Sequence, residues 1–477
     1  MIVWIILAVI VFFIAVILIR TLCFKPEKQS QTEFEAVSFD GERSIATLAE
    51  LIKCKTVSFE DKSLEDNSEF EKLISMLPEL YPNVFSVCEY QRPGTRSLLF
   101  RWKGKSDGAP AVLMAHFDVV PVEEENWTHP AFDALIEDGV MWGRGTLDTK
   151  VTFNGVLSAA DNLISRGYVP ENDIWFAFAG DEEIDGTGAK TIVEIFKERG
   201  ITPAMVVDEG GAVVQDVFPG VSEACGLIGI AEKGMINVEF SCTSSGGHAS
   251  APAPHTPVGI LSAACERIEN HPFPLRITAP AAKMFDTLGR HSTFLYRMIF
   301  ANLWCFSPIL DIICRKSGGE MNALLRTTVA FTQMSGSLAP NVIPPSASMV
   351  ANIRLNPLDT IDSALEHLKK TINNESVEIK YLNGSNPSPI SLTDCESWIR
   401  VKNAVEGTWR GCITAPYLMV QCSDSKHYGE ICDKVYRFSA MDLTAEERHT
   451  IHGNDERIRL ETAKRAVEFY IRLMEQC

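Results

Sequence analysis

The chain lacks the excess of basic residues that nucleic-acid-binding proteins carry. Its 477 residues include 44 Lys and Arg against 62 Asp and Glu, which leaves a formal net charge of −18. Because nucleic-acid binding depends on cations that neutralise phosphates, we expect no nucleic-acid partner. The acidic surplus either is ordinary solubilising surface or includes carboxylates gathered for cations.

The sequence also lacks any Cys-x-x-Cys pair and any internal repeat. Its 13 cysteines are scattered and odd in number, unlike those of a disulfide scaffold or a zinc ribbon. We therefore expect most of them to be small buried hydrophobic residues. With 46% hydrophobic and 22% charged residues, the chain can bury a large core in two or three domains, which excludes a peptide hormone or a disordered tail.

Long hydrophobic runs are absent except at the amino terminus. Every residue from Met1 to Ile19 is apolar, and the first positive charges are Arg20, Lys25 and Lys28. This run is long enough to cross a bilayer, and no small-residue cleavage site follows it. We expect residues 1–24 to be a transmembrane anchor. A cleaved signal is the alternative, and a buried soluble helix is disfavoured because it would have a polar face.

The location of the main body depends on this segment. The few positive charges after it favour a cytoplasmic body, but that rule fails for some large trailing domains. Glycosylation sequons at Asn126, Asn374 and Asn383 suit a lumenal body. We predict a single-pass protein of the secretory pathway with an extracellular or lumenal body, which would be secreted if the segment is cleaved.

Apolar runs and helical periodicity then predict an α/β domain. Residues 25–42 are mostly polar and indicate a tether. Buried strands are expected at 111–115, 174–179 and 205–207, separated by helices at 152–166 and 189–199. Strands and helices in this order favour a parallel sheet. We assign 43–230 to the first part of a catalytic domain.

A smaller α+β unit is predicted to interrupt this domain between residues 231 and 390. Residues 236–240 and 348–355 alternate like half-exposed strands, and 377–382 resembles a further strand. Helical patterns follow at 257–269 and 360–373. The catalytic domain is expected to resume at 391–477 and to close with a helix at 457–474.

Each of the three predicted buried strands ends in residues that can bind a metal. His116 and Asp118 follow the first, Glu182 and Glu183 follow the second, and Asp208 follows the third. The carboxyl ends of parallel strands share one edge of the sheet, so these side chains should converge. His116 can bind metal while Asp118 orients it by hydrogen bonding.

A glycine-rich turn adds Asp148, whose carboxylate could bridge two ions. Alone, each of these groups is more often surface polarity than a metal site. Carboxylates buried together need compensation, and divalent cations provide it. Imidazole mixed with carboxylates favours zinc, with cobalt or manganese as lesser candidates.

At these residues the sequence resembles the co-catalytic di-zinc amidohydrolases that include aminoacylase, carnosinase and carboxypeptidase S. Within that family it is most similar to the branch of carboxypeptidase S and the N-fatty-acyl-amino acid synthase/hydrolases. Thr149 departs from the branch, which usually has a second Asp there, and we expect altered support of the metal site without loss of metal. The motifs that carry the resemblance are His116-x-Asp118, Gly143-Arg144-Gly145-x-x-Asp148, Glu182-Glu183, Asp208-Glu209-Gly210-Gly211 and Ile451-His452-Gly453.

The resemblance implies a di-zinc aminopeptidase-like catalytic domain with an inserted ferredoxin-like lid and dimerisation domain, in a homodimer. It also implies two Zn²⁺ per chain and Glu182 as general base, with Asp118 orienting a ligand. By position, Asp148 bridges the ions. The remaining implied ligands are His116 and Asp208 on one ion, and Glu183 and His452 on the other.

Three residues of the smaller unit match one catalytic and two substrate-binding positions of the family. His248 matches a histidine that stabilises an oxyanion across a dimer interface. Asn341 and Arg354 match positions that hold the substrate carboxylate, a task that suits a guanidinium group. Without the resemblance, Arg354 alone would be read as a surface strand residue.

Residues 285–314 form an unusually apolar stretch. It could be a dimer or lid-packing helix pair, a pocket wall or membrane-facing patch for a fatty acyl chain, or other packing.

From the resemblance we expect hydrolysis of N-(fatty) acyl amino acids with a free carboxylate, a reaction that can also run as condensation. A carboxypeptidase S-like enzyme that cleaves short peptides is the alternative. A catalytically inactive, membrane-anchored binding protein of the same fold is a third hypothesis, although no catalytic residue is missing.

Overall fold

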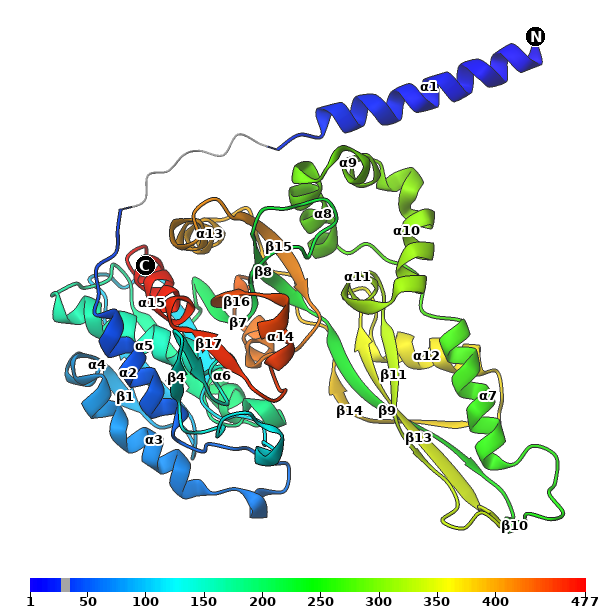
Figure 1. Ribbon diagram of the computed structural model, residues 1–477, viewed down its shortest axis with the longest axis horizontal. Helices are drawn as coiled ribbons and strands as arrows, with labels where there is room; N and C mark the ends of the chain where they lie inside the picture. The colour runs from blue at the N-terminus through cyan, green and yellow to red at the C-terminus, as the bar shows by residue number, and fades with distance from the viewer. Residues whose placement is uncertain (27–34) are drawn as a thin grey trace.

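The computed structural model describes residues 1–26 and 35–477. Residues 27–34, within the predicted tether, lie outside this part. The amino-terminal end of helix α1 (Ile2–Cys23) projects away from the rest of the chain, which consists of an α/β body and an elongated smaller unit (Figure 1). The body begins at α2 (Gly41–Ile52), two residues before the predicted start, because the Asp40 side chain caps this helix by accepting the amide of Arg43.

An eight-stranded mixed sheet forms the centre of the body, in the order β1-β2-β6-β3-β7-β16-β8-β15. Its middle strands β6, β3 and β7 pair in parallel, which confirms the predicted α/β arrangement. The strand bounds are β1 Glu89–Gln91, β2 Leu98–Trp102, β3 Ala111–His116, β6 Ile174–Ala179, β7 Met205–Val214, β8 Cys225–Glu232, β15 Ile413–Met419 and β16 Val435–Leu443.

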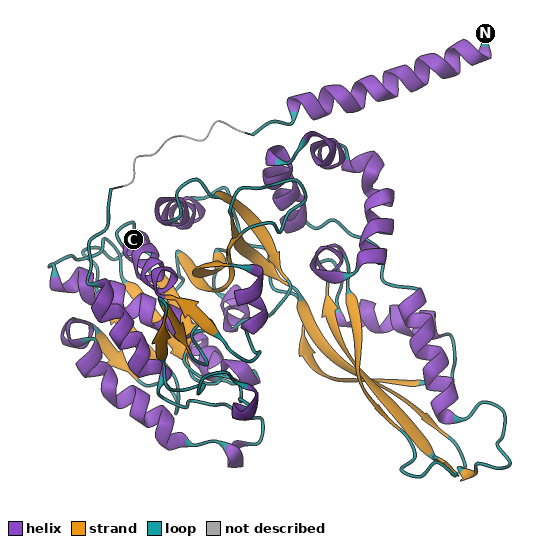
Figure 2. Cartoon of the chain, viewed as in Figure 1, coloured by secondary structure: helices purple, strands orange, loops and turns teal. Residues whose placement is uncertain are grey.

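Both faces of this sheet are covered, and the strands are apolar on both sides for that reason. On β3, Leu113 belongs to the core under α5 and α15, whereas Val112 and Met114 belong to the core under α6. Figure 2 shows these helices on either side of the strands. The helices of the body are α2, α3 Asn67–Leu80, α4 Pro82–Val87, α5 Lys150–Ser165, α6 Gly188–Glu198, α13 Glu396–Thr408, α14 Ala445–Thr450 and α15 Leu460–Met474.

A three-stranded sheet lies beside the main one and positions the segments around residues 143–148 and 452–456. Its order is β17 (Arg457–Arg459), β5 (Val140–Trp142) and β4 (Leu135–Glu137). The predicted closing helix at 457–474 therefore begins only at Leu460, because its first three residues pair with β5. This pairing brings the turn after β5 next to the residues just before β17.

The smaller unit contains a four-stranded antiparallel sheet in the order β11-β13-β9-β14. Alternate residues of β9 are buried against helices α7 and α12, as the alternating sequence pattern predicts. A short pair, β10 with β12, lies at the far tip (Figure 1). The bounds are α7 Pro257–Asn270, α12 Ile361–Ile372, β9 Gly234–Thr243, β10 Gly247–His248, β11 Thr328–Ser335, β12 Val342–Ile343, β13 Ser346–Leu355 and β14 Glu378–Ser385.

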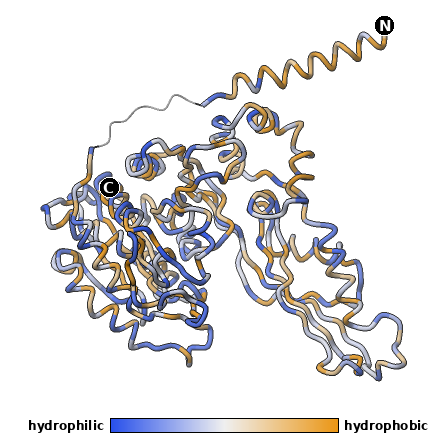
Figure 3. Tube along the Cα trace, viewed as in Figure 1, coloured by the Kyte–Doolittle hydropathy of each residue, from blue (hydrophilic) through white to orange (hydrophobic). Residues whose placement is uncertain are grey.

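The apolar stretch forms helices between the two units. They are α8 (Ala279–His291), α9 (Phe294–Ala301), α10 (Leu303–Ser317) and, after it, α11 (Gly319–Leu325). Helix α8 packs into the body core, whereas α9 and α10 expose many apolar side chains. Figure 3 shows the hydropathy of each residue along the chain.

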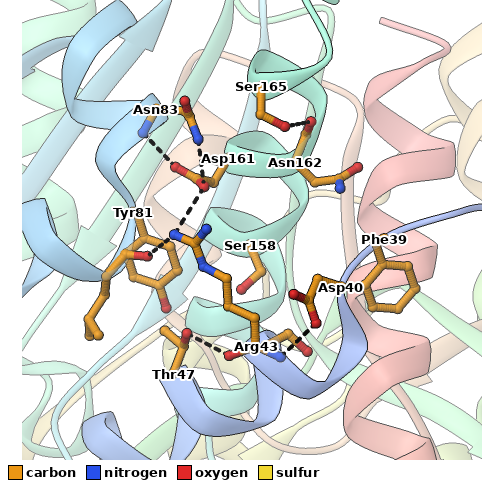
Figure 4. A pocket seen from close by; sticks show the side chains of 12 residues that line it. Phe39, Asp40, Arg43, Thr47, Tyr81, Asn83, Ser158, Asp161, Asn162 and Ser165 are labelled. Atoms are coloured by element: carbon orange, nitrogen blue, oxygen red, sulfur yellow. Dashed lines mark hydrogen bonds and ion pairs between the residues drawn. The ribbon is translucent and has the colours of Figure 1, made fainter.

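Side chains in a polar pocket under α2 connect α2 and α4 to α5 (Figure 4). Asp161 on α5 accepts hydrogen bonds from the backbone amides of Asn83 and Val84 and from the Asn83 side chain, and Arg43 approaches its carboxylate at 3.7 Å. The carboxylate is thus fully used in joining α2 and α4 to α5. All 13 cysteines are free, and most are buried.

Candidate metal centre

The structure brings predicted ligands together where strands of the main sheet end. His116 is the last residue of β3, and Glu183 lies in the turn (η3, Glu182–Ile184) after β6. Asp148 lies in the turn between β5 and α5, and its peptide bond to Thr149 is cis. His452 follows α14 and has a left-handed backbone with φ of 57°, a conformation that non-glycine residues adopt mainly at constrained sites.

Asp148 lies between two histidines. Its Oδ1 is 3.0 Å from Nε2 of His116, and its Oδ2 is 3.0 Å from Nε2 of His452. The same nitrogen of His452 is 3.1 Å from Oε2 of Glu183. One carboxylate oxygen directed at each imidazole is the arrangement that a bridging ligand needs.

Asp118 is fully buried behind the cluster. His116 Nδ1 is 3.0 Å from its backbone oxygen and 3.3 Å from its carboxylate oxygen Oδ1. The two carboxylate oxygens also accept the backbone amides of Glu182 and Glu183, each at 3.2 Å. Asp118 therefore orients the imidazole of His116 and holds the η3 turn against the strand.

The structure places Glu209 in the cluster beside His116, where the sequence predicted Asp208. Glu209 Oε1 is 3.4 Å from His116 Nε2, and it forms a group with His116 and Glu182 in which ligand atoms lie within 4.8 Å of one another. Asp208 instead accepts the backbone amide of Ser425 at 3.0 Å. Because β7 continues through both residues, their side chains point to opposite faces. The sequence shows that Asp208 and Glu209 are adjacent acids but not which one faces the site.

The charges of the cluster depend on one another. Burial works to lower the pKa of His116, but neighbouring carboxylates, Glu209 first, raise it well above its ordinary value. Hydrogen bonds from His116 and His452 lower the pKa of Asp148 although burial opposes them. Hydrogen bonds to Asp148 and Glu183 raise the pKa of His452 to about 10. Both imidazoles therefore meet more negative charge than they can balance.

The negative charges of the other carboxylates are poorly balanced by positive groups. Burial raises the pKa of Glu182 well above its ordinary value and raises that of Glu209 to about 8, with the charge of Asp148 contributing to the shift of Glu209. The buried Oε1 of Glu183 has no hydrogen-bond partner among residues 1–26 and 35–477. In the part of the chain that the structure describes, Asp148, Glu183 and Glu209 form ion pairs with histidines alone. This donor set fits divalent cations, which would compensate buried carboxylates and use the orphaned oxygen.

Glu456 and Arg144 support the turn that carries Asp148, and sequence reasoning gave Glu456 no role. Glu456 is fully buried, and its Oε2 accepts a hydrogen bond from Arg144 Nη1 at 2.6 Å. Its Oε1 accepts the backbone amides of Leu147 at 2.7 Å and Asp148 at 3.2 Å. The sequence gives little indication of this supporting role, because Glu456 is distinguished only by its position four residues after His452.

Thr149 is buried beside Asp148, at the start of α5. Its hydroxyl donates to Thr152 at 2.8 Å, so it forms a bond within its own helix. An Asp here would add a further carboxylate to an already acidic cluster.

Among the described residues, none of the three predicted residues of the smaller unit forms a hydrogen bond or ion pair with this cluster. His248 and Asn341 meet at the tip, where the Ala249 amide donates to the backbone oxygen of Asn341 at 3.0 Å (Figure 1). His248 is exposed and bonds Ser250. Arg354 lies near the end of β13 that is away from the tip, and it donates to Cys422 of the body at 3.4 Å.

Known proteins match this chain over most of its length. The model of Peptidase family M20/M25/M40 matches residues 112–476. N-fatty-acyl-amino acid synthase/hydrolase PM20D1 of Xenopus tropicalis is 34% identical over 473 residues, which cover 97% of this chain and 92% of that protein. Probable carboxypeptidase S-like 2 of Dictyostelium discoideum is 34% identical over 436 residues, covering 90% and 84%.

A solved structure shares the fold. The M20 family metallo-carboxypeptidase Sso-CP2 of Sulfolobus solfataricus aligns with a TM-score of 0.68 at 15% identity, over 91% of this chain and 98% of that one. With the cluster at the strand ends, these matches identify a hydrolytic enzyme that acts on amide or peptide bonds. The chain belongs to the M20/M25/M40 family of peptidases.

Proposed function

We propose that the protein hydrolyses the amide bond of N-fatty-acyl amino acids with the help of two divalent cations. The observation that carries this proposal is the position of Asp148 between His116 and His452, with Glu183 and Glu209 beside the two histidines. Two sets of ligands that share one carboxylate suit a pair of ions.

The ligand sets follow from these contacts. His116, Asp148 and Glu209 would hold one ion, while Asp148, Glu183 and His452 would hold the other. Zinc is the proposed metal, because the set mixes imidazole with carboxylates. When bound, the ions would acidify a water molecule and polarise the amide carbonyl.

Glu182 is the proposed general base. Its carboxylate lies within the group that contains His116 and Glu209, yet it is not needed in either ligand set. It can take a proton from the attacking water and pass it to the leaving nitrogen. Asp118 keeps Glu182 in place by accepting its backbone amide.

Replacement of Glu182 by Gln tests this role. The variant should bind two metal ions per chain, measured by elemental analysis, and lose roughly 10²–10⁴-fold in kcat. Glu194→Gln, an exposed position on α6, is the control. Unchanged turnover of Glu182→Gln would show that another group is the base, and full activity without metal would exclude the cation mechanism.

The tip of the smaller unit is proposed to serve the site of a second subunit. His248 and Asn341 are exposed and contact none of the metal-binding side chains of their own chain in the described residues. In a homodimer, the tip could reach the partner's cluster, where the His248 imidazole would stabilise the oxyanion. Asn341 from the tip and Arg354 from beside the body would hold the substrate carboxylate.

A fatty acyl substrate is supported by similarity to the synthase/hydrolase of Xenopus tropicalis. Hydrolysis of short peptides with a free C-terminus is the second candidate, supported by similarity to the carboxypeptidase S-like protein. A panel that crosses acyl length with dipeptides separates the two. Because hydrolysis is reversible, excess fatty acid and amino acid should also yield the condensed product.

We also propose that α1 anchors the protein in a membrane. This helix has 22 residues with a mean hydropathy of 3.6 over its most apolar window, and only Ile17 and Thr21 are buried. The body is proposed to be lumenal or extracellular, or secreted if α1 is removed. Protease protection in sealed vesicles would give the orientation, since a lumenal body would resist digestion until the membrane is opened.

A further inference from the structure

Helices α9 and α10 form a bent apolar pair next to α1. They meet at 112° around Asn302, and together they are long and apolar enough to be a broken span or a re-entrant segment. Monomeric soluble proteins rarely expose so many large apolar side chains together. The side chains of this α9–α10 face are 51–62% exposed and are Phe294, Leu295, Trp304, Ile309, Ile312 and Ile313.

Specific contacts hold α1 against this pair. The ring of Phe13 meets the ring of Trp304 edge-on, with 5.6 Å between centroids. The side-chain amide of Asn302 donates to the Ile17 carbonyl and the Thr21 hydroxyl, both at 3.3 Å. Asn302 itself is fully buried. These contacts therefore hold α1 in a defined position against the bend between α9 and α10.

The contacts also satisfy the backbone at the bend. Ala301 ends α9, where the last carbonyls of a helix have no partner within it. Its carbonyl accepts two hydrogen bonds from the Arg20 guanidinium, at 3.2 Å from Nε and 3.0 Å from Nη2. A helix break in lipid is tolerated where protein groups satisfy its backbone, and Arg20 does this for the Ala301 carbonyl at the bend.

The same contacts set the depth of α10 relative to α1. Phe13 precedes Arg20 by seven residues, or about 10 Å along the helix. If α1 crosses a bilayer with Arg20 at the headgroups, Phe13 lies about a third of the way into a hydrocarbon core of about 30 Å. Trp304 touches Phe13, so the beginning of α10 must lie at a similar depth.

We propose that the α9–α10 face is a second membrane-embedded element, inserted into the leaflet nearest the enzyme body, with lipid acyl chains as its partner. This inference rests on the proposed anchoring by α1. Exposed Lys25 and Lys316, at the ends of α1 and α10, are placed to meet lipid headgroups. The element would hold the body against the membrane surface, so that substrates with long acyl chains could reach it from the leaflet.

Photolabelling of the full chain tests the inference. The protein is reconstituted into phosphatidylcholine vesicles that contain a phospholipid with a photoactivatable group on its acyl chain, and labelled peptides are mapped by mass spectrometry. We expect label on α1 and on the α9–α10 face. Leu64 and Leu338, which are apolar and at least as exposed but lie elsewhere, are internal controls and should remain unlabelled.

The distribution of label along the chain tests membrane insertion of the α9–α10 face and of α1 separately. Label on α1 with α9–α10 no more labelled than Leu64 would overturn the inference while leaving the anchor intact. Absence of label on α1 would refute the anchor. The catalytic proposal is independent, because turnover of a water-soluble N-acetyl substrate in detergent does not depend on the result.

A matched pair of variants gives a second readout. Ile312→Glu should lower turnover of a long-chain substrate supplied in vesicles at least several-fold and leave turnover of a soluble short-chain substrate unchanged. Leu338→Glu is the control and should alter neither rate. An equal loss on both substrates for Ile312→Glu would indicate a folding defect, and an unchanged vesicle rate would contradict membrane insertion.

Discussion

At the scale of single residues, the choice between Asp208 and Glu209 decides the composition of the metal centre. Asp208 is buried and Glu209 is half-buried on the same strand, yet of the two only Glu209 forms an ion pair with His116 among the described residues. We expect Glu209→Gln to lose one of two bound metal ions per chain, because a ligand is removed. Asp208→Asn should retain both ions. Elemental analysis of the purified variants checks this, and metal loss in Asp208→Asn alone would support Asp208, the ligand predicted from the sequence.

Some residues of the candidate site can be predicted from sequence motifs, and others cannot. Motifs in the sequence mark His116, Asp148, Glu183 and His452, and the structure brings their side chains together, while their role as ligands stays a prediction. Glu456 could not be predicted in this way, since its importance comes from a contact with Arg144 that is distant in sequence. The side to which Asp208 points depends on where β7 ends, and the sequence does not reveal that β7 continues through both acids.

At the scale of elements, the turn before α5 depends on the buried Glu456–Arg144 pair. Glu456→Gln keeps the shape but weakens the ion pair and the bonds to the backbone of the turn. We expect about 10–100-fold weaker metal binding, by analogy with other groups that orient ligands. Metal titration of the variant measures this loss.

Glu461→Gln is the control for that variant, because Glu461 forms a surface pair with Lys464. Exposed pairs contribute little, so its metal affinity should be unchanged. If Glu456→Gln binds metal as tightly as the parent protein, the turn is held by other contacts.

Elements with strong periodicity were predicted well, and those set by long-range pairing were not. The strand at 174–179 and the helix at 257–269 match β6 and α7 closely. The expected start of the last helix was wrong, because residues 457–459 pair with β5 instead. The stretch at 285–314 gave no periodic signal for the bend at Asn302, which depends on contacts with α1.

At the scale of the whole molecule, the exposed tip predicts a site shared between subunits. Glu182→Gln and His248→Ala should each be nearly inactive alone. When the two variants are co-expressed, mixed dimers would contain one intact site, with Glu182 from one chain and His248 from the other. We expect activity to reappear in the mixture, measured after purification with two different tags.

Within-chain catalysis would give another result. If each chain used its own His248, neither chain of a mixed dimer could be active. No recovery of activity above that of the separate variants would therefore contradict a shared site.

The central claim for the whole molecule is that this family member cleaves fatty acyl amides of amino acids. The most direct measurement is kcat/KM for the N-oleoyl and N-acetyl derivatives of one amino acid, together with a dipeptide that has the same C-terminal residue, using the full chain loaded with zinc. The account predicts that the N-oleoyl substrate is preferred over both others. Preference for the N-acetyl substrate or the dipeptide would contradict it.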